Sequence, residues 1–303
     1  MDVALAIDVG GTKMAAGLVT AEGELVASAA SPTPRHADAE RLFSLLVDLV
    51  DAVGGSAAAE PPRGRRVGSG GRGEVVVCGV GCGGPMTRGG EEVSPLNIPG
   101  WRRFPLRSRL AEATGLPTFV DNDAKALALG EGWRGAAADV DDFIAMVVST
   151  GVGGGIVLDG RLLDGESGNA GHIGHVIVEP EGRACACGGQ GCLEAEASGP
   201  AIAAVTGRPA AEADAGTIVR TGTLVGRAVA SVVNLLDLRL AVVGGSVALG
   251  FGDPFFAAAQ SELDARARLE FSRGARIVPV GLGEKGPLVG AAAVGWRGVR
   301  EPG

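Results

Sequence analysis

Short apolar runs alternate with polar turns along the chain, which predicts strands separated by helices. Near the N-terminus, Ala4–Ile7 predicts a buried strand, and Ala15–Val19 predicts its hairpin partner after a Gly-Gly turn. A third strand is expected around Leu25. Apolar residues between 42 and 53 recur at helical spacing, so a helix should follow this three-stranded opening.

The same opening returns in the middle of the chain. Residues 143–148 predict a buried strand, 149–151 a tight turn and 155–158 a returning strand. Set beside residues 3–26, this repetition indicates two related domains, each with a glycine hairpin. Two facing hairpins of this kind can hold a polyphosphate through backbone N–H groups. A chance similarity between two glycine-rich hairpins would give the same pattern.

The remaining segments continue the alternation of strands and helices. We expect strands over 75–80, 118–120, 240–243 and 276–280, and helices over 105–114, 124–133, 216–236, 254–269 and from 287 onward. This order predicts an α/β architecture with mainly parallel sheets.

Size and charge narrow the class of protein. The 303 residues are 46% apolar, enough for two packed domains. A net charge of −8 argues against nucleic acid or an anionic membrane as a partner. No apolar run approaches the ~18 residues of a spanning helix, and the N-terminus lacks the basic leader of a signal peptide. With five cysteines that do not resemble a secreted disulfide framework, we expect a cytoplasmic protein.

Residues 54–73 have no periodicity and are rich in Gly, Pro and Arg. This composition predicts a mobile surface loop, with an anion-binding arm as the alternative.

The first candidate site is Asp8-Val9-Gly10-Gly11-Thr12-Lys13. Its glycines allow the backbone to approach phosphate closely, Thr12 adds a hydroxyl donor, and Asp8 can orient Mg²⁺ through water. The spacing matches neither a Walker A loop nor a Rossmann fingerprint. A plain hairpin turn is the alternative.

The second candidate is Asn122-Asp123, at the junction between an expected strand and helix. Open α/β sheets bind ligands beyond the carboxyl ends of their strands. Asp123 can therefore accept a hydroxyl proton during phosphoryl transfer, or serve only as a helix N-cap.

The third candidate comprises His175, Cys185, Cys187 and Cys192. One imidazole and three thiols at this spacing suit a closed, tetrahedral structural zinc site. Packed core cysteines are the alternative, which is also our interpretation of Cys78 and Cys82.

Taken together, these motifs resemble the ROK family of sugar kinases and repressors, particularly its bacterial glucokinases, over nearly the whole chain. The resembling segments are Asp8–Lys13, Gly79–Pro85, Ser94–Trp101, Asn122–Ala124, Ser149–Gly155, Gly168–Glu194 and Gly244–Val247. The resemblance implies a two-domain actin-like ATPase (ribonuclease H-like) fold with an interdomain cleft. We expect a domain of 1–118 plus 288–303, and a second domain of 119–287 with the zinc site.

The resemblance also implies residue roles. Asp123 would be the general base on the 6-hydroxyl of a hexose. Sugar contacts would come from Gly84, Asn97, Asn122, Asp123, His172, His175 and Glu194. ATP would be bordered by Asp8, Gly10, Gly11, Thr12, Lys13, Thr150, Gly151, Gly153 and Gly245. ATP, Mg²⁺ and structural Zn²⁺ would be the cofactors, and a homodimer the assembly.

Two departures bear on the substrate. His172 replaces a glutamate that ordinarily accepts hydrogen bonds from sugar hydroxyls, so the recognised hydroxyl pattern can differ. Lys125 stands where a small polar residue often follows the catalytic motif. Glucose is the leading substrate hypothesis, with kanosamine, N-acetylmannosamine or a C7-cyclitol as alternatives, and polyphosphate as an alternative donor.

Two other classes of protein compete with a kinase. A sugar-sensing ROK regulator would carry a helix-turn-helix before the first phosphate motif, which here begins at residue 8. A catalytically inactive sugar-binding protein is disfavoured because Asp8 and Asp123 are both present.

Overall fold

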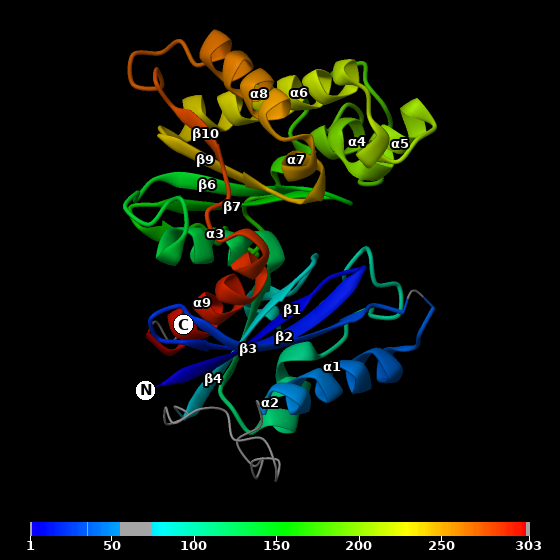
Figure 1. Ribbon diagram of the computed structural model, residues 1–303, viewed down its shortest axis with the longest axis vertical. Coiled ribbons are helices and arrows are strands. Elements are labelled where there is room, and N and C mark those ends of the chain that lie inside the picture. Colours follow the sequence, from blue (N-terminus) through cyan, green and yellow to red (C-terminus); the bar gives the residue numbers. More distant parts are fainter. Residues whose placement is uncertain (1, 35, 55–73, 301–303) are drawn as a thin grey trace. The chain divides into compact units, whose positions relative to one another are not determined.

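The computed structural model describes residues 2–34, 36–54 and 74–300, arranged in two compact units (Figure 1). Unit 1 comprises Met1–Trp133, Asp164–Asn169 and Glu284–Gly303, and unit 2 comprises Arg134–Leu163 and Ala170–Gly283. Apart from Gly54, the loop expected at 54–73 lies outside the described residues.

Strands and helices alternate as the apolar pattern predicts. The described strands are β1 Val3–Val9, β2 Lys13–Thr20, β3 Leu25–Pro32, β4 Val75–Cys82, β5 Thr118–Asn122, β6 Phe143–Val148, β7 Val152–Leu158, β8 Arg161–Leu162, β9 Leu240–Gly244 and β10 Arg276–Pro279. The described α-helices are α1 Ala39–Val53, α2 Leu106–Thr114, α3 Asp123–Arg134, α4 Leu193–Ala197, α5 Gly199–Thr206, α6 Ala215–Leu236, α7 Ser246–Phe251, α8 Asp253–Arg266 and α9 Gly286–Arg300.

The two sheets have the same topology, which confirms the repeat seen in the sequence. Unit 1 has the strand order β3-β2-β1-β4-β5, and unit 2 has β8-β7-β6-β9-β10. In each sheet the opening three strands pair antiparallel and the other two pairings are parallel. The expectation of mainly parallel sheets is therefore wrong. Short glycine turns after β1 and β6 can join only antiparallel neighbours.

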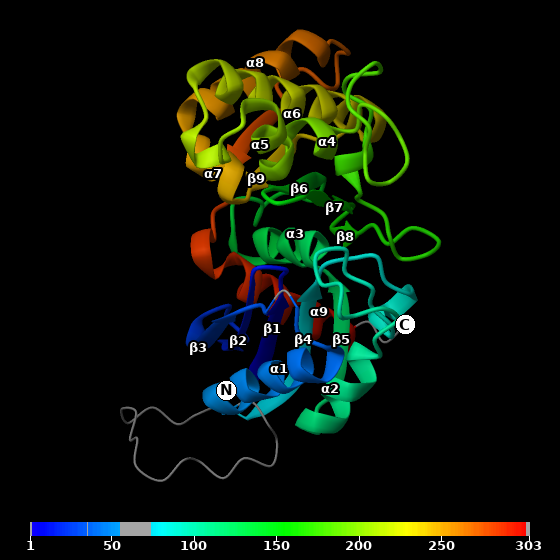
Figure 2. The same cartoon turned by 90° about the vertical axis from the view of Figure 1, so that its right-hand side faces the viewer.

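Side chains of β1 alternate between the two faces of the unit 1 sheet. Leu5 and Ile7 pack in a core with α1 and α2, whereas Ala4 and Ala6 face α9 on the opposite side (Figure 2). Small residues on that second face let α9 approach closely. A Cβ on Gly79 would collide with the backbone of α9 at Ala291.

The core of unit 2 lies between its sheet and α6. Ile144 and Met146 of β6 pack in one cluster with Val225 and Val229 of α6. Helix α8 crosses α6 closely because Gly226 leaves room for the backbone of α8, where a Cβ would meet Ala259. These two helices are labelled side by side in Figure 1.

The boundary of unit 1 differs from the one expected after residue 118. Strand β5 pairs with β4 from Cys78↔Thr118 to Cys82↔Asn122, so residues 118–122 complete the first sheet. Helix α3 follows in the same unit up to Trp133, and the segment Asp164–Asn169 also belongs to it.

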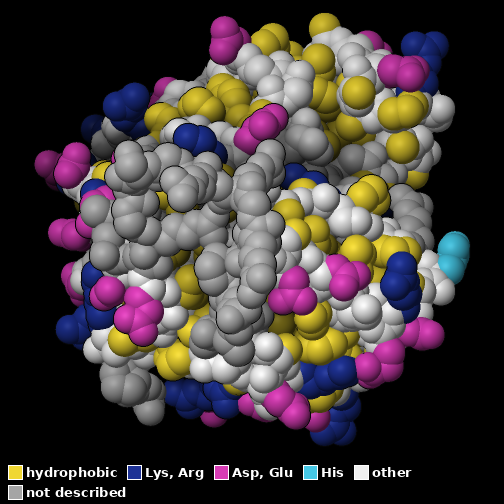
Figure 3. Space-filling model, turned by 60° about the horizontal axis from the view of Figure 1, so that its bottom comes forward, with side chains coloured by type: hydrophobic (Ala, Val, Ile, Leu, Met, Phe, Trp, Pro, Cys, Tyr) yellow, Lys and Arg dark blue, Asp and Glu magenta, His cyan; other side chains and the backbone are white. Residues whose placement is uncertain are grey.

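The outer surface carries charges of both signs. On the face shown in Figure 3, acidic and basic side chains are interspersed with apolar ones. Within the described ranges, none of the helices combines the length and the apolar character needed to cross a bilayer.

Candidate functional site

The first glycine turn of unit 1 lies between β1 and β2. Its ends are joined by a hydrogen bond from the N–H of Gly10 to the carbonyl of Lys13, at 3.0 Å. Thr33 closes the turn from the side, donating its hydroxyl to the Gly10 carbonyl at 2.7 Å and its N–H to the Thr12 carbonyl at 3.0 Å. The turn is thus held by backbone groups and the Thr33 hydroxyl, while Thr12 and Lys13 remain exposed.

Gly11 allows the Asn97 loop to lie against this turn. A Cβ added at Gly11 would lie 2.5 Å from Asn97 Cβ and 3.0 Å from the Asn97 carbonyl. Real Cβ atoms do not approach that closely, so only glycine fits here. Asn97 itself is exposed, so its amide is available to a ligand beside the turn.

Asn122 and Asp123 lie at the junction between β5 and α3. Both side chains accept a hydrogen bond from the N–H of Ala124, at 3.0 Å to Asn122 Oδ1 and 2.8 Å to Asp123 Oδ1. The capping alternative is therefore real, and the Asp123 carboxylate is also exposed. Gly84 borders the same place, since a Cβ there would lie 3.3 Å from Asn122 Nδ2.

Asp8 and Asp123 face each other across Gly81. A Cβ on Gly81 would lie 3.7 Å from Asp123 Cα and 4.0 Å from Asp8 Oδ1. Burial, and after it the charge of Asp123, raises the pKa of Asp8 to about 7, against the opposing charge of Lys13. The same surroundings raise the pKa of the buried Cys82 thiol, first through burial and then through Asp123 and Asp8. Paired carboxylates of this kind supply the hard oxygen ligands that Mg²⁺ prefers.

The second glycine turn, in unit 2, lies against the carboxylate of Glu194. Val152, which begins β7, donates its N–H to Glu194 Oε2 at 2.8 Å, and a Cβ on Gly151 would lie 2.9 Å from the same oxygen. Glu194 lies in the first turn of α4. Gly151 therefore leaves the space that the glutamate carboxylate occupies.

Gly245 begins the helix that follows β9, next to this second turn. Its φ of 97° is one that residues with a side chain rarely adopt, and a Cβ there would collide with the Val148 carbonyl. The hydroxyls of Ser149 and Ser246 lie 2.9 Å apart. Gly153 lies in β7, and Thr150 lies in the connection between β6 and β7.

The predicted zinc ligands converge in unit 2. One ligand atom from each of His175, Cys185, Cys187 and Cys192 lies within 4.8 Å of every other. Cys185 Sγ is 3.7 Å from His175 Nδ1, and Cys187 Sγ is 3.8 Å from Cys192 Sγ. A tetrahedral site with Zn–S bonds of about 2.3 Å requires sulfur separations of about 3.8 Å. The donor set and its spacing therefore fit zinc.

The backbone around the cluster forms the expected knuckle. Cys185 donates its N–H to the Gly189 carbonyl at 2.8 Å, and Gly188 donates to the Cys185 carbonyl at 2.9 Å. His175 ends the short helix Ile173–His175, which begins directly after His172. The rings of His172 and His175 lie 6.0 Å apart, so an exposed imidazole adjoins a ligand of the metal cluster.

The structure groups the predicted residues within each unit. Unit 1 holds Asp8, Gly10, Gly11, Thr12, Lys13, Gly84, Asn97, Asn122 and Asp123. Unit 2 holds Thr150, Gly151, Gly153, His172, His175, Cys185, Cys187, Cys192, Glu194 and Gly245. Cys78 and Cys82 are buried free thiols, as the sequence suggested, and His36 is exposed.

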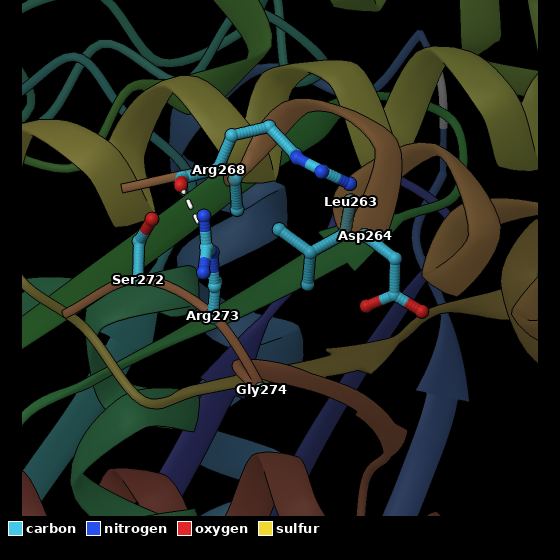
Figure 4. Close-up of a pocket in the computed structure, with 7 residues that line it drawn as sticks. Leu263, Asp264, Arg268, Ser272, Arg273 and Gly274 are labelled. Carbon is cyan, nitrogen blue, oxygen red and sulfur yellow. Dashed lines mark hydrogen bonds between the residues drawn. The ribbon is translucent and has the colours of Figure 1, made fainter. Parts of the chain in front are cut away.

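A separate pocket of 330 Å³ lies at the end of α8 and the loop that follows (Figure 4). Arg273 spans it, donating Nε to the Arg268 carbonyl at 3.1 Å, with Asp264 on the opposite wall. None of the predicted site residues lines this pocket.

Comparison with known proteins defines the family. The ROK family model matches residues 4–296, so the chain belongs to the ROK family. It is 37% identical over 265 residues to an N-acetylmannosamine kinase of Escherichia fergusonii, covering 82% of this chain and 84% of that protein.

Solved structures of the family have the same fold. A ROK hexokinase from Thermus thermophilus has a TM-score of 0.78 at 31% identity, covering 98% of this chain and 99% of that one. A ROK glucokinase from Streptomyces griseus, in complex with glucose and AMPPNP, has a TM-score of 0.81 at 28% identity, covering 98% and 100%. The two mixed five-stranded sheets are those of the actin-like, ribonuclease H-like ATPase fold, which confirms the predicted fold class.

Proposed function

We propose that the chain is an ATP-dependent sugar kinase that phosphorylates the 6-hydroxyl of N-acetylmannosamine. The observation that carries this proposal is the 37% identity to an N-acetylmannosamine kinase over 84% of that protein's length. The sequence alone favoured glucose, with amino sugars as the alternative. The curated relatives support the amino sugar, whereas the glucose-bound structural relative is 28% identical.

The residues of unit 1 support the chemistry of the proposal. The exposed carboxylate of Asp123 would accept the proton of the sugar hydroxyl as its oxygen bonds to the γ-phosphorus and ADP leaves. Asn122, Asn97 and Gly84 would line the sugar site beside it. Gly10, Gly11, Thr12 and Lys13 would border the phosphates.

The residues of unit 2 would complete the recognition of both ligands. Glu194, His172 and His175 would contact sugar hydroxyls, and Thr150, Gly151, Gly153 and Gly245 would border the nucleotide. In phosphoryl transfer, catalysis depends on positioning and on neutralising the phosphate charge.

Two metals have separate tasks in the proposal. Mg²⁺ bound with ATP would supply charge neutralisation on the phosphates, and Asp8 would hold its water shell. His175, Cys185, Cys187 and Cys192 would hold Zn²⁺, which stabilises the segment that carries His172 and Glu194. The family resemblance further leads us to propose a homodimer, which light scattering after size exclusion can test.

The test is ADP release with Mg-ATP across N-acetylmannosamine, glucose, mannose, kanosamine and a C7-cyclitol, with polyphosphate as an alternative donor. We expect kcat/KM for N-acetylmannosamine to exceed that for glucose by at least about tenfold, a discrimination of about 1.4 kcal/mol. A preference for glucose would contradict the assigned substrate. If none of the sugars increases the rate of ADP release, the assignment as a sugar kinase is contradicted.

A variant separates substrate choice from the reaction. His172→Glu restores the acceptor that glucokinase-like sequences carry, so the ratio of glucose to N-acetylmannosamine turnover should rise. His36→Glu makes the same chemical change on an exposed histidine and should leave the ratio unaltered. An unchanged ratio in His172→Glu would remove that residue from substrate recognition.

A further inference from the structure

Lys125 is a buried cation in the first turn of α3, the helix that begins at Asp123. Its side chain is 3% exposed, and its Nζ lies 2.9 Å from Asp121 Oδ1 and 2.7 Å from Asp164 Oδ1. It also donates to the Gly168 carbonyl at 3.2 Å. All three donors of the ammonium group therefore have acceptors within unit 1.

A second cation completes this group. Arg297 of α9 donates to Asp164 Oδ2 at 2.9 Å and lies 3.8 Å from Asp121 Oδ2. Two carboxylates are thus matched by two cations. Burial raises the pKa of Asp121, and the adjacent Lys125 opposes that rise. Removing Lys125 would leave two carboxylates with one cation, in surroundings where an unpaired charge is costly.

The Asp121–Lys125 pair spans the proposed catalytic junction. Asp121 lies in β5 and Lys125 in α3. Their ion pair therefore joins the residues on either side of Asn122 and Asp123. Asp164 and Gly168 hold Lys125 from the other side. They belong to the segment Asp164–Asn169, which Asn169 fastens to unit 1 by donating to the Met86 carbonyl at 3.3 Å. The ends of the junction are therefore fixed by contacts distant in sequence.

We propose that Lys125 is a positioning residue for Asp123, holding the first turn of α3 in the orientation that aims the carboxylate at the sugar hydroxyl. The inference rests on the proposed kinase activity. Lys125 touches neither substrate nor nucleotide in this account. It acts by fixing the backbone on both sides of Asn122-Asp123. A misplacement of a catalytic group by about 1 Å can cost about 100-fold in rate.

Lys125→Met tests this role, because it keeps the length of the side chain and removes its charge. We expect kcat to fall about 10- to 100-fold while the KM for ATP stays within about threefold. The matched control is Arg227→Met, which breaks a comparable group in unit 2, where Arg227 contacts Glu179 at 2.6 Å and Glu262 at 3.1 Å. That control should lose stability but keep kcat within about twofold.

Hydrogen exchange supplies a readout that does not depend on activity. The N–H of Ala124, bonded to Asn122 and Asp123, should exchange faster in Lys125→Met and at the wild-type rate in Arg227→Met. If Lys125→Met fails to fold, Asp164→Asn serves instead. It removes the charge and one of the two acceptor oxygens of this half-buried carboxylate, and it should show both effects at smaller size.

Two results would overturn the proposal: a folded variant with kcat within about twofold of wild type, or unchanged exchange at the junction. Failure of the kinase assignment would look different. The wild type itself would release no sugar-dependent ADP, while the exchange comparison would still report whether Lys125 orders the junction.

Discussion

Asp8 and Asp123 approach each other across Gly81, so that burial together with the charge of Asp123 raises the pKa of Asp8 to about 7. An acidic group with a raised pKa in the folded state binds its proton more tightly there than in the unfolded chain. Ionising Asp8 therefore costs folding free energy until a cation neutralises the pair. A phosphate-bound Mg²⁺ is a cation of the required kind.

The first prediction concerns the pH dependence of stability. Between its ordinary pKa of 3.8 and its folded pKa of about 7, Asp8 holds a proton only when folded, so the free energy of unfolding falls as pH rises. Asp8→Asn removes this dependence and should stabilise the protein at pH 8 relative to wild type. The difference between the two pKa values sets an upper bound of about 4 kcal/mol on this gain. Asp8 is only half-buried, so solvent screening should bring the gain below that bound.

Urea unfolding of both proteins at pH 5 and pH 8 measures the effect, in buffers without Mg²⁺ or nucleotide. Asp48→Asn on the exposed side of α1 is the control for a general change in charge. If wild type and Asp8→Asn differ by the same amount at both pH values, the raised pKa is wrong.

The second prediction concerns the close approach of Asn97 to the first glycine turn. Gly11→Ala places a Cβ 2.5 Å from Asn97 Cβ, so the turn and the Asn97 loop must separate. We expect kcat/KM to fall about 10- to 100-fold, because phosphate and sugar contacts are displaced together. Steady-state kinetics with the sugar and ATP varied in turn measure this fall in kcat/KM.

Gly250→Ala is the matched control for this glycine substitution. No atom lies within 4 Å of a Cβ added there, so activity should be unchanged. A Gly11→Ala enzyme as active as Gly250→Ala would show that the contact has no functional part.

The sequence predicted those features that depend on local pattern. Apolar runs and turn residues predicted the strand Phe143–Val148 and a similar glycine turn in each unit. The close spacing of three cysteines, with one histidine nearby in the sequence, predicted the ligands of the metal cluster.

Other features depend on contacts that local pattern does not contain. Asp164 and Arg297 meet Lys125 and Asp121 from positions far along the chain, and neither had been selected as a functional residue. The short helices α4, α5 and α7 were also missed, since their 5, 8 and 6 residues are too short for a helical period to show. The raised pKa of Asp8 requires burial that only the fold creates.

The third prediction concerns the metal cluster. Purified wild-type protein should contain about one zinc per chain, and Cys187→Ala should lose it because three ligands remain. The melting temperature should fall with the metal, and chelator treatment of wild type should reproduce that fall. Elemental analysis and thermal unfolding measure the two effects.

Cys78→Ala is the control for loss of a thiol, since Cys78 is buried in unit 1, outside the cluster. It should keep its zinc. Retention of zinc by Cys187→Ala would contradict the ligand assignment.

The most direct test of the kinase account is the turnover of Asp123→Asn with Mg-ATP and the preferred sugar. The variant keeps the size of the side chain and its capping oxygen but cannot accept the proton. We predict a fall in kcat of about 100- to 10,000-fold with the fold intact by circular dichroism. A folded Asp123→Asn protein with near-normal turnover would contradict the account.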